Sequence, residues 1–142
     1  MTENFTSDRA PEAVGAFPHA KRVGNLLFLS GIGPRKKNSK TIPGVTLDEH
    51  GAIAAYDIEA QCHQVFQNVR TVLEDAGADW SAIVDVTVFL TNMKDDFAKF
   101  NPIFAAYFAG PGKPNPTRTT LEINCLPTPI AIELKVIAEI PT

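Results

Sequence analysis

The chain has 142 residues, of which 44% are hydrophobic and 20% are charged, with a formal net charge of -3. This length and composition predict one globular domain over residues 1–142, with a polar leader over residues 1–15. The slight acidic excess does not favour nucleic acid as a partner, and no apolar run approaches the roughly 20 residues that cross a bilayer. The leader lacks the basic start and apolar core of a signal peptide, so a cytoplasmic protein is expected.

Cysteine and histidine are sparse in the chain. Cys62 and Cys125 are too few for a disulfide framework, and neither lies in a metal-type spacing. The three histidines, at positions 19, 50 and 63, are scattered rather than clustered. We therefore expect no bound metal.

Strand patterns follow the leader. Residues 20–33 (AKRVGNLLFLSGIG) predict two short strands about a turn at Gly24 and Asn25. Residues 34–51 are rich in charge, proline and glycine and predict a loop. A third strand is expected around residues 52–56.

The clearest periodic pattern predicts a helix over residues 58–76. Apolar residues recur there at steps of three and four, with Asp57 as the N-cap and Gly77 as the stop. The apolar set is Ile58, Cys62, Val65, Phe66, Val69, Val72, Leu73 and Ala76. The pattern is typical of an amphipathic helix lying on a sheet.

A further strand and a second helix are predicted next. The β-branched run 82–91 indicates a strand, and aromatic residues at helical spacing indicate a helix over residues 94–110. Because Pro102 has no backbone donor, we expect the helix to break and restart there, with Asn101 as a cap. The aromatic stripe is expected to lie in the core rather than in a cofactor site.

The C-terminal stretch from Pro116 to Ile140 predicts two strands around a Leu-Pro-Thr-Pro turn. Antiparallel pairing across this turn would set Thr120 roughly opposite Glu133, with Arg118 one diagonal step away. Two interpretations remain open at this point. The charged side chains form a cross-strand ion pair on a solvated face, or they form a polar site.

The order of the elements predicts the architecture. It indicates an α+β domain in which a mixed sheet of about six strands carries two helices on one face. The other sheet face would then be uncovered, and in a chain this short another copy of the same chain is the expected cover. We therefore expect a homo-oligomer with sites at its subunit boundaries.

Three stretches taken together resemble a known family. "VGNLLFLSG", "VDVTVFLTNMKDDFAKFNPIFAAYF" and "PTRTTLEINCLP" are similar, in order, to the reactive-intermediate (enamine/imine) deaminases, the Rid or YjgF-like family. The resemblance extends over nearly the whole chain from about Ala16. It implies a chorismate-mutase-like α+β fold and a homotrimer, alone or as a dimer of trimers. It also implies clefts between subunits that bind small carboxylates without a metal or an organic cofactor.

The resemblance assigns roles to three residues. It implies that Arg118 binds the substrate carboxylate, that Glu133 positions a water, and that the backbone of Gly31 contacts the substrate. A guanidinium can hold a carboxylate through two parallel hydrogen bonds. A carboxylate can orient a water and take its proton as the water attacks an imine carbon. The expected reaction is therefore hydrolysis with release of ammonia.

Three other matched positions show where this chain follows or departs from the family pattern. Phe17 stands where relatives often have a tyrosine, so a hydroxyl is missing there. Thr120 replaces a frequent cysteine, which removes thiol chemistry but keeps a hydrogen-bonding group. Asn101 matches an asparagine of the family's second helix, with a cap preferred over a pocket role.

Within the family, "GAFPHAKRVGNLLFLSGIGPR", "TIPGVTLDEHG" and "AAYDIEAQ" are most similar to 2-aminomuconate deaminases. The resemblance implies hydrolysis of 2-aminomuconate to 4-oxalocrotonate (2-oxohexenedioate) and ammonia in aromatic degradation of the 2-aminophenol type. A six-carbon dicarboxylate needs a second cation at its far end, because an unpaired buried carboxylate is costly. Arg35 is the candidate and His19 the weaker one, although Arg35 also fits a solvated loop beside Lys36 and Lys37.

Two alternatives are kept. One is a general deaminase of 2-iminobutanoate and 2-iminopropanoate, which would share Arg118 and Glu133. The other is a small-ligand-binding or interaction module without turnover. Retention of Glu133 argues against the second alternative, because binding alone needs the arginine but not the base.

Overall fold

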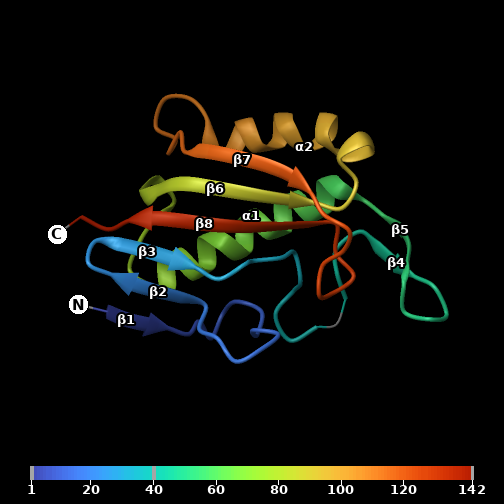
Figure 1. Ribbon diagram of the computed structural model, residues 1–142, viewed down its shortest axis with the longest axis horizontal. Helices are drawn as coiled ribbons and strands as arrows, with labels where there is room; N and C mark the ends of the chain where they lie inside the picture. The colour runs from blue at the N-terminus through green and yellow to red at the C-terminus, as the bar shows by residue number, and fades with distance from the viewer. Residues whose placement is uncertain (1, 40, 142) are drawn as a thin grey trace.

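The computed structural model describes residues 2–39 and 41–141, and a six-stranded sheet forms its centre (Figure 1). The elements are β1 (Thr2–Phe5), β2 (Ala20–Val23), β3 (Leu26–Leu29), β4 (Val45–Leu47), β5 (Ile53–Tyr56), α1 (Ile58–Asp75), a 3-10 turn (Trp80–Ala82), β6 (Ile83–Leu90), α2 (Met93–Phe108), β7 (Thr117–Glu122) and β8 (Ile132–Glu139). Neither helix combines the length and the apolar character that a membrane span requires.

The main sheet has the strand order β1-β2-β3-β8-β6-β7, and β4 pairs with β5 in a separate two-stranded sheet. β7 runs parallel to β6, whereas the other neighbouring strands of the main sheet are antiparallel. Both helices lie on the same side of the sheet, behind it in Figure 1. The predicted α+β class, with a mixed sheet and two helices on one face, is therefore confirmed.

Helix α1 forms where the sequence pattern predicts it. The Asp57 carboxylate caps its start by accepting from the backbone N–H groups of Glu59 at 2.9 Å and Ala60 at 3.3 Å. Its apolar stripe is buried against the sheet, which is the main source of stability for a helix of this length. Gly77 follows with a positive φ of 85°, a conformation that ends helices and that glycine adopts without strain.

Helix α2 does not break at Pro102, contrary to expectation. It runs without interruption from Asn92, whose side chain caps its start, to Phe108. The proline removes only the bond that its own nitrogen would have donated to the preceding turn. Phe100 and Phe108 are completely buried on either side of it, and this packing holds the helix together. Asn101 consequently lies inside the helix and is not a cap.

The predicted C-terminal hairpin is also wrong, because β6 lies between β7 and β8. Helix α2 carries the chain from β6 to β7 as a crossover, and such connections join parallel strands. β7 therefore becomes an edge strand of the sheet. Thr120 aligns with Val88 of β6 and Glu133 with Phe89, so Thr120 and Glu133 do not face each other.

The alternation along β8 separates the two faces of the sheet. The buried set, toward the helices, is Ile132, Leu134, Val136 and Ala138, and the set on the open face is Glu133, Lys135, Ile137 and Glu139. Residues aligned across neighbouring strands share a face. Arg118 aligns with Val86 and through it with Val136, so Arg118 points to the helix side. Arg118 and Glu133 thus project from opposite faces.

Two short strands lie in segments predicted to be irregular. β1 falls inside the polar leader and pairs with β2, and β4 falls inside the predicted 34–51 loop and pairs with β5. Both strands are largely exposed, so they lack the apolar alternation that signals a half-buried strand. Backbone pairing with a neighbouring strand, rather than side-chain burial, defines them.

Candidate functional site

The guanidinium of Arg118 lies between β7 and α2 and is surrounded by aromatic rings. Its Cζ atom stands 4.7 Å from the ring centre of Phe104, 5.4 Å from that of Phe100 and 5.9 Å from that of Phe97. Its Nη1 donates to the Asn101 side-chain oxygen at 2.8 Å. Asn101 therefore orients the guanidinium, and the other donors of the fork remain available for an anion.

The charge of Arg118 has no acidic partner within 4 Å among the described residues. Burial lowers the pKa of Arg118, but an arginine stays protonated in proteins. The side chain lines an open groove of about 600 Å³ together with Lys94 and Thr120. The Thr120 hydroxyl oxygen is buried and makes no hydrogen bond to any described residue. The groove thus offers a cation without an acidic partner among the described residues, and the Thr120 hydroxyl is buried beneath it.

Glu133 lies on the open face beside Gly31. A Cβ added at Gly31 would come within 2.7 Å of the Glu133 Oε2 atom, so the carboxylate occupies the space that any larger residue would fill. Burial raises the pKa of Glu133 above its usual range, and no basic side chain in the described part of the chain forms an ion pair with it. A desolvated carboxylate with a raised pKa is suited to act as a general base near neutral pH.

The position of Gly31 relative to β8 is fixed by the neighbouring backbone. Ile32 donates to the carbonyl of Leu134 and accepts from its N–H group, both at 2.9 Å. This isolated bridge continues the sheet one step beyond β3. The Gly31 backbone and the Glu133 carboxylate are therefore held on one frame.

Replacement of Gly31 by alanine tests this close approach. The added methyl group must displace the carboxylate, so we expect Gly31→Ala to lower kcat by about tenfold or more. The Glu133 side chain can move aside at little cost, so the thermal midpoint should change little. Ammonia release and a melting curve measure the two effects. An unchanged kcat would show that the carboxylate position is not critical, and a Gly31→Ala/Glu133→Gln double variant should lose little beyond Glu133→Gln alone.

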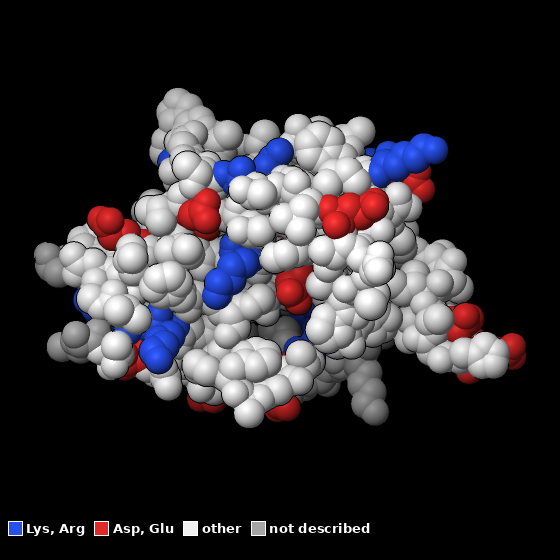
Figure 2. Space-filling view, viewed as in Figure 1, with Lys and Arg blue, Asp and Glu red and all other residues white. Residues whose placement is uncertain are grey.

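A cavity lies next to Glu133. The volume in which the centre of a water molecule can move inside it is about 50 Å³. Figure 2 shows the open face of the sheet, with charged side chains scattered over it and a hollow near its centre. Phe17, Gly31, Arg35 and Glu133 all line this cavity. Four residues predicted for the site are therefore brought together here.

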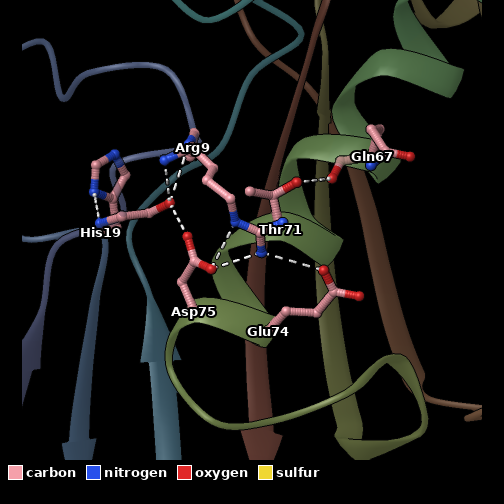
Figure 3. Close-up of polar contacts among 8 residues, drawn as sticks. Arg9, His19, Gln67, Thr71, Glu74 and Asp75 are labelled. Carbon is pink, nitrogen blue, oxygen red and sulfur yellow. Dashed lines mark hydrogen bonds and ion pairs between the residues drawn. The ribbon is translucent and has the colours of Figure 1, made fainter.

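Residues 6–17, called the strap below, form one wall of this cavity and are tied to the end of α1 (Figure 3). Arg9 donates to Asp75 at 2.6 and 2.9 Å and to Glu74 at 3.3 Å. Ser7 donates its hydroxyl to the other oxygen of Asp75. The bond from Arg9 lowers the pKa of Asp75, so this attachment is strongest with the carboxylate ionised.

His19 holds the strap from its other side. Its Nδ1 accepts from the backbone N–H of Ser7 at 3.0 Å, so the ring proton lies on Nε2, which donates to the carbonyl of Pro11 at 2.7 Å. His19 is buried, and both its nitrogens are engaged by backbone groups. Neither nitrogen is free to bind a substrate carboxylate, the role for which His19 was the weaker candidate after Arg35.

Arg35 is the cation that reaches the cavity. Its Nη2 donates to the carbonyl of Glu12 in the strap at 2.5 Å, and its own carbonyl is held by Asn68 of α1 at 2.7 Å. The sequence pattern did not single out Asn68. The available signal was a polar residue three positions after Val65, next to the apolar stripe of α1; Gln61 and Thr71 are likewise buried polar residues of this helix.

The predicted site residues fall into two groups on one chain. The cavity group is Phe17, Gly31, Arg35 and Glu133, and the groove group is Asn101, Arg118 and Thr120. The two groups lie on opposite faces of the sheet, so the expected ion pair between Arg118 and Glu133 does not form. The groove group contains the arginine predicted to bind the substrate carboxylate, and the cavity group contains the glutamate predicted to activate water.

The protein is a small α+β domain whose twisted sheet is covered by two helices on one face. A groove lined by Arg118 lies at the edge of this sheet, and a cavity lined by Glu133 lies on its open face. Residues 7–140 match the family model described as Endoribonuclease L-PSP, and the chain belongs to this family. The resemblance to the Rid/YjgF-like proteins is thereby confirmed.

Individual relatives agree with this membership. The chain is 34% identical over 96% of its length to Reactive Intermediate Deaminase A, chloroplastic, of Arabidopsis thaliana, of which it covers 65%. The crystal structure of the YjgF gene product from E. coli superposes with a TM-score of 0.81 at 28% identity, covering 96% of this chain and 98% of that one. The structure of E. coli TdcF with bound serine gives a TM-score of 0.80 at 26% identity, covering 98% and 99%.

Proposed function

We propose that the protein is a hydrolytic deaminase of enamines and imines that carry a carboxylate, and that each active site forms between two copies of the chain. One observation carries the proposal. A partly buried arginine and a desolvated carboxylate, each without a charged partner in the described part of the chain, project from opposite faces of one sheet. A second copy can bring its groove group to the cavity group of the first.

The reaction follows from these two side chains. Arg118 of one copy holds the substrate carboxylate by two parallel hydrogen bonds, which fixes the neighbouring carbon that bears the nitrogen. Glu133 of the other copy accepts a proton from a water molecule while the oxygen of that water bonds to the imine carbon. Glu133 passes this proton to the nitrogen, which gives a neutral carbinolamine. The carbinolamine hydroxyl then gives its proton to the nitrogen through Glu133, and the C–N bond breaks to give a 2-oxo acid and ammonia. An enamine substrate must first tautomerise to the imine.

The open face of the sheet supports assembly into a ring. Val23 and Leu26 remain 44% and 39% exposed there, and the neighbouring Phe28, Phe89 and Ile137 are only half-buried. Contact between two different surfaces, the groove edge of one copy and the open face of the next, is heterologous, and such contacts form a ring when the rotation between copies closes. We propose a homotrimer as that ring.

Two relatives add support. The Arabidopsis relative is named as a reactive intermediate deaminase, and the E. coli TdcF structure contains serine, a small molecule with a carboxylate and an adjacent amine. A 2-amino-2-enoate or a 2-imino acid has the same arrangement of groups around the α-carbon. The chain also carries 16 acidic and 13 basic residues, which gives it little attraction for RNA.

We propose 2-aminomuconate as the substrate, with 4-oxalocrotonate as the product. Arg35 and Glu133 line the same cavity, so a molecule whose reacting carbon lies at Glu133 can extend toward the guanidinium of Arg35. A second carboxylate there would be paired instead of being buried alone. Arg35 already donates one N–H to Glu12, and its remaining donors can bind this carboxylate.

The Arg35→Ala variant tests whether Arg35 binds the second carboxylate of the substrate or is only a solvated loop residue. We expect the KM for 2-aminomuconate to rise about tenfold, because one charge-assisted contact is lost, while kcat for 2-iminobutanoate stays within about twofold. Lys36→Ala, at the exposed neighbouring position, is the matched control and should change neither. An unchanged KM for the dicarboxylate would remove Arg35 from the site.

The general deaminase and the binding module predict other results for the wild type. Ammonia release should be measured from freshly generated 2-aminomuconate and, separately, from 2-iminobutanoate. If the protein is the proposed 2-aminomuconate deaminase, we expect fast turnover of the dicarboxylate and little turnover of 2-iminobutanoate. Preference for the small imine would favour the general deaminase, and no turnover of either compound would favour the binding module.

A further inference from the structure

Asn68 is a buried polar residue whose amide reaches from α1 to the segment that carries Arg35. It is 5% exposed. Its Nδ2 donates to the carbonyls of Gly33 at 2.8 Å and Arg35 at 2.7 Å, and its oxygen accepts from Gln64 at 2.9 Å. Both N–H bonds and the oxygen of the amide are therefore used. No apolar residue of the same size can satisfy these two carbonyls.

We propose that Asn68 is a positioning residue that fixes how Arg35 enters the cavity, and that it thereby sets the preference for a dicarboxylate. This role rests on the deaminase function proposed above and extends it to a residue that does not contact the substrate. Two carbonyls two residues apart, held by one amide, fix the backbone through Gly33, Pro34 and Arg35. The direction of the Arg35 side chain follows from that backbone.

Beyond Arg35, Lys37 forms a long ion pair of 4.0 Å with the exposed carboxylate of Glu12, and an exposed pair of this kind restrains the segment weakly. The described residues from position 36 to β4 contain no helix or strand, so the amide of Asn68 is the attachment nearest to Arg35 on the α1 side. On the opposite side, the Arg35 guanidinium donates to Glu12 of the strap. A line of hydrogen bonds therefore runs from Gln64 through Asn68 and Arg35 to the strap.

The catalytic carboxylate does not depend on this attachment. Ile32 exchanges two backbone hydrogen bonds with Leu134, and these hold Gly31 and Glu133 together without Asn68. Disturbing Asn68 should therefore move the far end of the cavity while leaving the reacting end in place. This separation predicts an effect on the KM of long substrates and little effect on kcat.

Asn68→Asp is the most specific test, because it preserves shape and the acceptor for Gln64 but turns an oxygen toward two carbonyls. Asn115→Asp is the matched control. Asn115 likewise donates to two backbone carbonyls, those of Gly110 at 2.9 Å and Lys113 at 2.8 Å, in a loop that lines neither the cavity nor the groove. Both substitutions place a carboxylate oxygen against two carbonyls, but Asn115 is exposed and Asn68 is buried. Asn68→Asp should therefore cost more stability than Asn115→Asp, and a melting curve of each variant measures this difference.

Three measurements give the expected result. For Asn68→Asp, the KM for 2-aminomuconate should rise about tenfold, while kcat for that substrate and kcat/KM for 2-iminobutanoate stay within about twofold. Trypsin should cut the unliganded protein faster after residues 35–37, because the segment is released. Asn115→Asp should change none of these values. If Asn68→Asp fails to fold, Asn68→Ala carries the same three expectations, since it removes the same two donors.

Three outcomes contradict the inference in distinguishable ways. A wild type that deaminates 2-aminomuconate, with variants of Asn68 that keep its KM and its tryptic cleavage rate, removes the role of Asn68 alone. A wild type that releases ammonia from neither compound overturns the proposed function and this role together. A fall in kcat for both substrates by the same factor would show a general structural role and would also contradict the inference.

Discussion

Neither Arg118→Ala nor Glu133→Gln protein should release ammonia at more than about one hundredth of the wild-type rate, yet a mixture of the two chains should recover activity. Each variant lacks one half of every site, because the two side chains lie on opposite faces of their own sheet. In a mixed ring, random exchange of equal amounts leaves about one site in four with both residues intact. The measurement is ammonia release after denaturing, mixing and refolding the two variants.

The control for this experiment is a chain that carries both substitutions. Mixed with wild type, it should lower activity, whereas mixed with either single variant it should restore nothing. Arg118→Lys provides a second comparison, because it keeps the charge but loses the planar pair of donors, and it should recover only part of the loss. Failure of the two single variants to complement each other, in rings shown to be mixed, would mean that both residues act from one chain.

Glu133→Gln should lower kcat by about 100- to 10,000-fold and abolish the acidic limb of the pH profile. In the wild type, kcat/KM should rise with pH through the pKa of Glu133, which burial raises above its ordinary value of 4.5. The base works only when ionised, so activity is lost as pH falls through this raised pKa. Rates measured from pH 4 to 9 check both points.

The raised pKa of Glu133 affects the free energy of unfolding in the opposite direction, because stability falls where activity rises with pH. A carboxylate whose pKa is higher in the folded state than in the unfolded chain favours folding when protonated, and this contribution is lost as pH rises through the folded-state pKa. Glu133→Gln removes the desolvated charge, so its thermal midpoint at neutral pH should equal or exceed that of the wild type. A lower midpoint would show that Glu133 has a structural role.

Local patterns predicted the elements that bury a periodic apolar face. The stripe from Ile58 to Leu73, the alternation along β8 and the turn at Gly24 all lie within short windows of sequence. In each case, the side chains that define the element are the same ones that it buries. This coincidence is the reason why α1 was predicted to within one residue and the turn between β2 and β3 was predicted at Gly24 and Asn25.

Pairing between distant segments could not be predicted in the same way. The proximity of β7 and β8 in sequence favoured a hairpin, but the crossover through α2 placed β6 between them. The face on which Arg118 lies follows from its alignment with Val86, which no local pattern encodes. Pro102 was misread for a related reason, since distant packing of the aromatic stripe outweighs the loss of one helix bond.

The separation of the two groups by the sheet also has a consequence for a newly made chain. In the proposed assembly, an isolated chain would have Glu133 without a bound substrate beside it and Arg118 without a base beside it. Such a chain would not catalyse the reaction until subunits associate. Catalytic output then follows the association equilibrium, and dilution below the dissociation constant should lower specific activity rather than leave it constant. Under this proposal, association of subunits would control when a folded chain becomes active.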